Sequence, residues 1–268
     1  MSKFITGVVA LLFILTSTGS AIGEMPDQAR SPNNPNRPVL DKVTFIHYKK
    51  NFGKPAGCNN DGICQGWESA DCADCVGSGN GGEEESTCYG FLSKEAKWKG
   101  TATYYINNNS GLEDSFVGAV VWLAAEEWDS FVDFELFDDS ITFTDEYKAG
   151  DQDFHNTLSW GNYPRDGVIA VTTVWGYFYG PPSKREIVEF DILFDTDYWW
   201  GDADTTECIP EFMDLQNIAT HELGHGAGLD DLYTSSCSEE TMYGYSEDCE
   251  TSKRDLGIGD ITGINKLY

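Results

Sequence analysis

His221-Glu222-Leu223-Gly224-His225-Gly226-Ala227-Gly228-Leu229-Asp230-Asp231 is the stretch from which fold and chemistry are best inferred. On a helix, residues four apart lie on one face, so His221 and His225 can aim an imidazole nitrogen at the same metal ion. Gly226 and Gly228 then end the helix, because glycine adopts left-handed backbone angles without a Cβ penalty. The chain can reverse there and return a third ligand, which the spacing predicts to be Asp231.

Three protein ligands with a water in the fourth position are typical of catalytic zinc, whereas structural zinc sites are closed by four ligands. Glu222 neighbours the first histidine and can reach such a water rather than the metal. Zinc acidifies its water and polarises a carbonyl, while Glu222 takes the proton as general base and delivers it to the leaving amine. These residues predict hydrolysis of peptide bonds in polypeptides, without a covalent intermediate.

Two alternatives concern the third ligand. Asp230 is adjacent to Asp231, and a more distant glutamate (Glu239, Glu240 or Glu247) would also supply a carboxylate. A different function is a secreted, calcium-dependent binding protein that keeps the fold without proteolytic activity. Glu222 distinguishes the two functions, because a protein that only binds has no use for a general base beside intact ligands.

The same stretch resembles the metzincin signature, with aspartate as third ligand where histidine is commoner. Met242 stands eleven residues after Asp231, where metzincins place the methionine turn beneath the zinc. A thioether is a poor zinc ligand beside imidazole and carboxylate, so we expect Met242 to pack under the metal. Residues 194–199 are similar to the matrixin strand that leads toward the active-site helix, and residues 256–268 to the matrixin carboxy-terminal helix.

The resemblance begins near Lys97 and implies a matrixin-like catalytic domain over residues 88–268. The expected fold class is α/β (α+β), with a mixed twisted sheet, an active-site helix and a C-terminal helix. Residue patterns predict these elements directly. Strands are expected at 101–106, 131–137, 167–175 and 186–194. Helices are expected at 112–129, at 214–225 with Asp214 or an upstream polar residue as a cap, and at 259–268. Residues 167–175 are either an edge strand that pairs with an extended substrate or an ordinary strand of the sheet.

Departures from the matrixin pattern are also visible. The histidines of a second, structural zinc site are missing except for His155, so that site is expected to be absent. Asp195 matches a calcium-binding position, but Tyr198 stands where a glutamate would be. Gly244 replaces the proline after the methionine turn, so the shape of a specificity pocket does not carry over. His155 and His47 are expected to be ordinary histidines, at the surface or internally satisfied.

The first residues are typical of export. Lys3 precedes an apolar run, Phe4 to Leu15, and small polar residues follow, which predicts a signal peptide over residues 1–23. Residues 24–57 are rich in proline, asparagine and charge and are expected to be a flexible arm. Residues 76–87 form a Gly/Glu linker. We therefore expect a secreted monomer, with no membrane segment in the mature form.

The net charge of −28 disfavours nucleic-acid binding, because phosphates require an excess of Lys and Arg, and this chain has 17 of these against 45 Asp and Glu. It also argues against anionic membrane surfaces. Acidity by itself identifies no partner, although bound calcium is one explanation.

The eight cysteines suggest disulfides in an exported chain. Residues 58–75 hold four of them and are expected to form a small disulfide-rich module, with a four-cysteine zinc site as the alternative. These four are Cys58, Cys64, Cys72 and Cys75. Acidic residues interleave with them and are candidate calcium ligands, namely Asp61, Glu68, Asp71 and Asp74.

The other four cysteines lie in the expected catalytic domain. Proximity to the inferred elements suggests Cys237 with Cys249 around the methionine turn, and Cys88 with Cys208. Some matrixins are kept latent by a prodomain cysteine on the zinc. No matching motif is present, and the even count leaves no spare thiol, so latency of that type is not expected.

Overall fold

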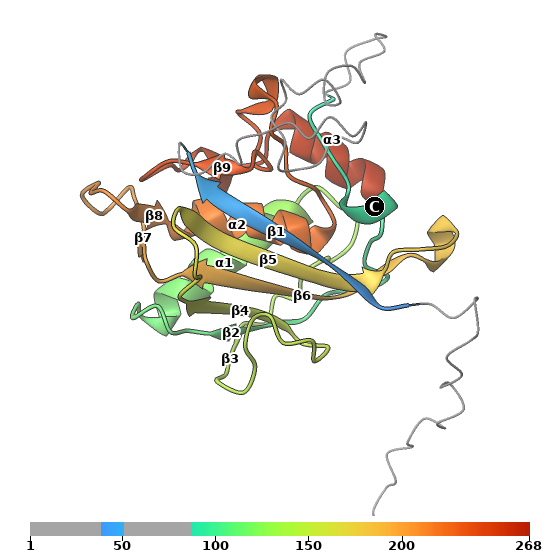
Figure 1. Cartoon of the computed structure of the whole chain (residues 1–268), viewed down its shortest axis with the longest axis horizontal. Helices are drawn as coiled ribbons and strands as arrows, with labels where there is room; N and C mark the ends of the chain where they lie inside the picture. The colour runs from blue at the N-terminus through green and yellow to red at the C-terminus, as the bar shows by residue number, and fades with distance from the viewer. Residues whose placement is uncertain (1–38, 51–86) are drawn as a thin grey trace, which may run out of the picture. The chain divides into compact units, whose positions relative to one another are not determined.

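The computed structural model describes residues 39–50 and 87–268 (Figure 1). The expected signal peptide (1–23) and cysteine-rich module (58–75) lie outside the described residues, with nearly all of the linker. Three α-helices are present in the described part: α1 Asp114–Asp129, α2 Leu215–Ala227 and α3 Ile258–Leu267. The strands there are β1 Asp41–Lys49, β2 Tyr104–Asn107, β3 Thr142–Phe143, β4 Asn156–Gly161, β5 Val168–Tyr177, β6 Glu186–Asp195, β7 Trp199–Gly201, β8 Phe212–Asp214 and β9 Tyr245–Ser246.

The main sheet is mixed, with the strand order β3-β2-β4-β6-β5-β1-β9. Strands β3, β2, β4 and β6 run parallel, while β5 is antiparallel to β6. Strand β1 then pairs antiparallel with β5 and parallel with β9. The expected α/β class with a mixed sheet is confirmed, and the active-site and C-terminal helices form close to their expected bounds.

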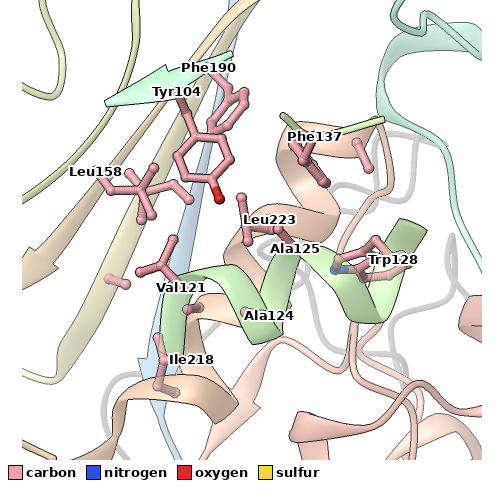
Figure 2. Packing of buried hydrophobic residues seen from close by; sticks show 14 of the residues in the cluster. Tyr104, Val121, Ala124, Ala125, Trp128, Phe137, Leu158, Phe190, Ile218 and Leu223 are labelled. Atoms are coloured by element: carbon pink, nitrogen blue, oxygen red, sulfur yellow. The ribbon is translucent and has the colours of Figure 1, made fainter. Parts of the chain in front are cut away.

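Helices α1 and α2 pack on each other, and α2 packs on β5 and β6 (Figures 1 and 2). Strand β6 directs Phe190 and Ile192 into this core. Trp128 at the end of α1 is fully buried, and its indole N–H donates to the Thr220 carbonyl of α2 at 2.8 Å. This bond satisfies the polar atom of the largest core side chain and fixes α2 against α1.

The ends of α2 follow from its sequence. The Asp214 carboxylate accepts a hydrogen bond from the Asn217 N–H at 2.9 Å, which is the expected N-terminal cap. Gly228 ends the helix with φ of 108°, a left-handed angle that favours glycine. Inside the helix, a Cβ on Gly224 would collide with the sulfur of Met242 and with the Trp128 ring. The close approach of these side chains therefore requires glycine at this position.

Two expectations about strands need correction, and one open alternative is decided. Residues 131–137 form turns rather than a strand, because the Asp129 carboxylate at the end of α1 accepts the N–H groups of Leu136 and Phe137. Of the two alternatives for residues 167–175, the structure has the ordinary strand, since β5 lies between β6 and β1. Residues 41–49, expected in a flexible arm, form β1.

The predicted pairing of the four cysteines in the catalytic domain is wrong. The structure joins Cys88 to Cys237 and Cys208 to Cys249. The Cys249 N–H donates to the Phe212 carbonyl at 2.8 Å, which carries Cys249 away from Cys237 and toward Cys208. Neighbourhood along the sequence was therefore a poor guide to neighbourhood in space. The four cysteines of residues 58–75 lie outside the described residues.

None of the helices described in residues 39–50 and 87–268 has the length and apolar character needed to cross a bilayer.

Candidate metal centre

Three side chains converge where α2 meets the loop that follows it. His221 and His225 project from one face of α2, and Asp231 returns from beyond Gly228. The Asp231 Oδ1 atom lies 3.3 Å from the Nε2 atom of His221 and 3.4 Å from that of His225. All three side chains are buried. The structure therefore brings together the three residues that the sequence spacing selected.

The hydrogen bonds of the imidazoles fix their tautomers. The Nδ1 atom of His221 donates to the Thr241 carbonyl at 2.7 Å, and that of His225 donates to the Leu229 carbonyl at 3.1 Å. A carbonyl only accepts, so each Nδ1 carries the proton and each Nε2 presents a lone pair. This is the outer support typical of metal-bound histidine.

The atoms at the centre of the group fit a zinc ion. Within the described residues, both histidine Nε2 atoms and Asp231 Oδ1 are buried without a hydrogen-bond partner. Buried polar atoms are nearly always paired, so three such atoms facing one another indicate a site for a metal ion. Two imidazole nitrogens and one carboxylate oxygen are the donor types that zinc takes in catalytic sites.

Electrostatics favour a cation at the same point. Burial opposes ionisation of Asp231, but the two imidazoles beside it lower its pKa well below the usual range. Burial lowers the pKa of His221 to about 4, so this imidazole is neutral at physiological pH. Asp231 is held in place by the Tyr233 hydroxyl, which donates to Oδ2 at 2.9 Å. Tyr233 was not singled out from the sequence, although it stands only two residues after the aspartate.

Glu222 lies beside the metal-binding atoms and is fully buried. Burial raises the pKa of its carboxyl to about 7. The Thr172 hydroxyl of β5 donates to Oε2 at 2.5 Å, and the Nδ1 atom of His47 lies 3.0 Å from Oε1. A carboxylate with a pKa near neutrality, next to a metal-binding group, has the properties of a general base.

The alternative third ligands are engaged elsewhere. Asp230 is exposed, and its Oδ1 atom accepts the N–H of Asp231 at 2.9 Å. Glu240 accepts the N–H of Gly259 at 2.8 Å, and Glu247 forms an ion pair with Lys50 at the surface. Of the groups in the described residues that could hold a metal, none includes these three carboxylates, or Glu239.

Met242 is buried beneath α2, against Gly224. Asp260 of α3 holds its turn in place by accepting the N–H groups of Thr241 and Met242, at 2.6 and 3.1 Å. Because the Thr241 carbonyl accepts from His221, this turn connects α3 to the orientation of a metal-binding imidazole.

His47 is the main residue whose contact with the candidate site was missed from the sequence. It is satisfied internally, as expected, but its partners are Glu222 and the Ser246 hydroxyl, 3.0 Å from its Nε2 atom. Its ring centroid lies 3.9 Å from that of His221. The alternation of Val43, Phe45 and His47 is the sequence signal that could have placed this histidine on the inner face of a strand.

Two other expected residues lie away from the centre. Asp195 is buried at the end of β6, where its carboxylate accepts the N–H groups of Asp197 and Tyr163, at 2.9 and 3.3 Å. Nothing in these contacts supports calcium. His155 is partly exposed and stacks on the Tyr147 ring, with centroids 3.8 Å apart. The candidate calcium ligands Asp61, Glu68, Asp71 and Asp74 lie outside the described residues.

Comparisons with known proteins agree with this geometry. The family model described as matrixin matches residues 97–268. Metalloendoproteinase 1-MMP of Arabidopsis thaliana is 30% identical over 186 residues, which cover 67% of this chain and 46% of the relative. Metalloendoproteinase 1 of Glycine max is 30% identical over 185 residues, which cover 67% of this chain and 55% of the relative. The chain spans about half the length of these curated relatives.

Proposed function

Since the chain belongs to the matrixin family, we propose that it is an exported zinc-dependent endopeptidase that hydrolyses peptide bonds in polypeptides. The observation that carries the proposal is the convergence of three buried, unpartnered ligand atoms beside a buried carboxylate. In this assignment His221, His225 and Asp231 hold zinc, and Met242 supports the site from below. Glu222 is the catalytic residue.

Zinc held by these residues would polarise the scissile carbonyl and acidify a water. Glu222 takes the proton of the attacking water at one carboxylate oxygen and later delivers it to the leaving amine nitrogen. The hydroxyl of Thr172 holds the other oxygen and so fixes the direction in which the base points. The raised pKa of Glu222, caused by burial, lets one side chain act as base and then as acid near neutral pH.

Export and extracellular action are part of the proposal. Their support is the signal-peptide pattern of residues 1–23 together with two disulfides in the described residues, which persist in oxidising compartments. We propose a monomeric protease whose partners are its polypeptide substrates.

A comparison of the wild type with Glu222→Gln tests the proposal. Both zinc-loaded proteins are incubated with a diverse peptide mixture, and the products are read by mass spectrometry. Loss of the base is expected to slow cleavage by ~100-fold or more, because proton transfer contributes factors of this order. Exposed Glu239→Gln is the matched control and should cleave as the wild type does.

Zinc content measured on the same samples separates loss of the base from loss of the metal. Equal cleavage by Glu222→Gln and the wild type, with equal zinc, would show that Glu222 is not the base.

A further inference from the structure

Strand β1 lies across the candidate active site, between β5 and β9. Its backbone pairs antiparallel with β5, where His47 faces Ala170, and parallel with β9, where Tyr48 faces Tyr245. Beyond the ladders, the Lys49 N–H donates to the Gly167 carbonyl at 2.8 Å, and the Lys50 N–H donates to Ser246 at 2.8 Å. The strand therefore bonds to its neighbours along both edges.

Alternate side chains of β1 point into the metal centre. The Phe45 ring stacks on the His225 ring with centroids 3.9 Å apart and an angle of 5° between the planes. The His47 ring lies 3.9 Å from the His221 ring. Both β1 side chains are buried, at 6% and 1% exposure, so the metal-binding residues are covered from this side.

A side chain of β1 also contacts Glu222, the proposed general base. His47 Nδ1 lies 3.0 Å from one oxygen of Glu222, and Thr172 bonds to the other. The Ser246 hydroxyl holds the opposite nitrogen of His47 and keeps the ring in this orientation. Both oxygens of Glu222 are thus already in contact with protein groups, so an attacking water would have to compete with His47 for the oxygen that His47 contacts.

A polypeptide substrate would need the place that β1 takes. An extended peptide binds by adding a strand to a free sheet edge, where main-chain hydrogen bonds hold it. Strand β5 passes the catalytic residues and is bonded on one side to β6 and on the other to β1. Strand β1 lies outside residues 97–268, the part that matches the family. The edge of β5 that faces away from β6 is thus taken by a segment outside the family match.

We propose that residues 41–49 are a built-in inhibitory strand, which occupies the substrate position of its own chain and must leave before a polypeptide can bind. The inference rests on the proposed function and adds its regulation. The strand contains no cysteine, so this latency does not depend on a thiol on the metal. Two contacts anchor its end: Lys49 pairs with Asp248 at 2.8 Å, and the Arg165 guanidinium lies 5.0 Å from the centre of the Tyr48 ring.

The activity test uses the full chain carrying Phe45→Lys and His47→Ala together, which puts a charge where the apolar ring stacks and removes the contact to the base. Lys42→Ala, on the exposed face of the same strand, is the matched control. The double variant is expected to cleave a fluorogenic peptide at least about 10-fold faster than the wild type, because a tethered strand competes at millimolar effective concentration. The control should stay as slow as the wild type. Equal rates in all three proteins would overturn the inference and leave the proposed function standing.

The binding test does not depend on catalysis. A fluorescent peptide with the sequence of residues 39–50 is titrated into zinc-loaded proteins that also carry Glu222→Gln, so that it is not consumed. The double variant should bind the peptide, and the otherwise unchanged chain should bind it at least about 10-fold more weakly. Equal binding by both, or binding by neither, would overturn the inference. If the double variant binds the peptide selectively but no protein cleaves a substrate, the result would support the inhibitory strand and contradict the proposed peptidase function.

A second route guards against misfolding of the double variant. A recognition site for a sequence-specific protease is placed within residues 77–82 of an otherwise unchanged chain, and the folded protein is cut. Cutting should raise the rate of peptide cleavage, and adding back the 39–50 peptide should lower it again. The same peptide with lysine and alanine in place of Phe45 and His47 should not inhibit. Unchanged activity after release of the segment, verified by gel filtration, would contradict the proposal.

Discussion

The metal centre and the middle of β6 both hold buried carboxylates, but these differ in whether their oxygens accept hydrogen bonds. At the metal centre, the Oδ1 atom of Asp231 is buried without a hydrogen-bond partner and faces two imidazole nitrogens. On β6, Glu189 and Asp191 are also buried, at 0% and 1% exposure, yet each carboxylate accepts several N–H groups. We call these two side chains the carboxylate clamp.

The carboxylate clamp fixes a loop rather than a ligand. Glu189 accepts the N–H groups of Asp153 and Phe154, each at 2.9 Å. Asp191 accepts those of Gly150 and Thr157, at 2.7 and 2.9 Å. Residues 150–157 are thereby tied to the sheet by main-chain donors. A buried carboxylate saturated in this way stabilises the fold by itself, whereas an unsaturated one among lone pairs is a place for a cation.

The largest expected difference between the metal centre and the carboxylate clamp follows when a carboxylate in each is replaced by an amide. Asp231→Asn should weaken zinc binding by ~100-fold or more, because it removes a charged ligand and not only a supporting contact. Glu189→Gln should leave zinc binding unchanged and lower the free energy of unfolding by about 2 kcal/mol, since its amide N–H₂ faces main-chain donors. Competition with a chromophoric chelator measures the first effect, and urea unfolding of the zinc-loaded protein measures the second.

Equal zinc affinity for wild type and Asp231→Asn would transfer the third ligand to another carboxylate. A large loss of zinc in Glu189→Gln would show that the carboxylate clamp also supports the metal centre, in addition to holding residues 150–157.

The sequence predicted the metal centre better than the clamp, for a physical reason. His221, His225 and Asp231 lie within eleven residues, so helix geometry and one glycine-containing turn decide how they meet. Two of the partners of Glu189 are main-chain N–H groups some 35 residues away, and the third is the side-chain amide of Gln152. Main-chain donors leave no signature in a sequence, so these contacts could not be inferred.

A smaller effect on zinc affinity is expected from a change at Tyr233, which supports a metal ligand without being one. Tyr233→Phe removes the hydroxyl that donates to Asp231 Oδ2 while keeping the ring. Loss of such a supporting bond should weaken zinc binding about 10-fold, less than loss of the ligand itself. The same chelator competition measures it, with Tyr245→Phe as the control, because that ring packs near Tyr233 and its hydroxyl makes no hydrogen bond to Asp231. An affinity as low as that of Asp231→Asn would mean that the carboxylate position depends wholly on this one hydroxyl.

Long-range features account for the sequence-based errors. The inner side chains of β1 alternate regularly, but the proline and asparagine residues before them favoured a flexible arm. What makes β1 a strand is its pairing with β5, more than 100 residues later. The predicted disulfide pairing was wrong for the same reason, since Cys88 and Cys237 are 149 residues apart and meet only through tertiary packing. Local patterns predicted helices and their caps, while pairings between distant segments depended on the whole fold.

A separate expected effect concerns the pH dependence of stability and belongs to the carboxylate clamp. Burial raises the pKa of Asp191 to about 8, with the nearby charges of Glu189 and Asp153 acting in the same direction and two main-chain N–H groups opposing. The folded protein therefore keeps a proton that the unfolded chain loses near pH 4. The contribution of this group to stability is complete below pH 4 and is lost as pH rises toward 8.

The thermal midpoint of the wild type relative to Asp191→Asn is the quantity to measure, because changes at the metal centre then cancel. Asparagine stays neutral at every pH, so the wild-type midpoint should fall relative to the variant by about 10 °C between pH 4 and pH 8, with zinc saturating. Parallel curves would mean that the main-chain donors hold Asp191 ionised throughout. In that case the clamp would resemble the metal centre in carrying a permanent negative charge, and would differ from it only in the donors that neutralise the charge.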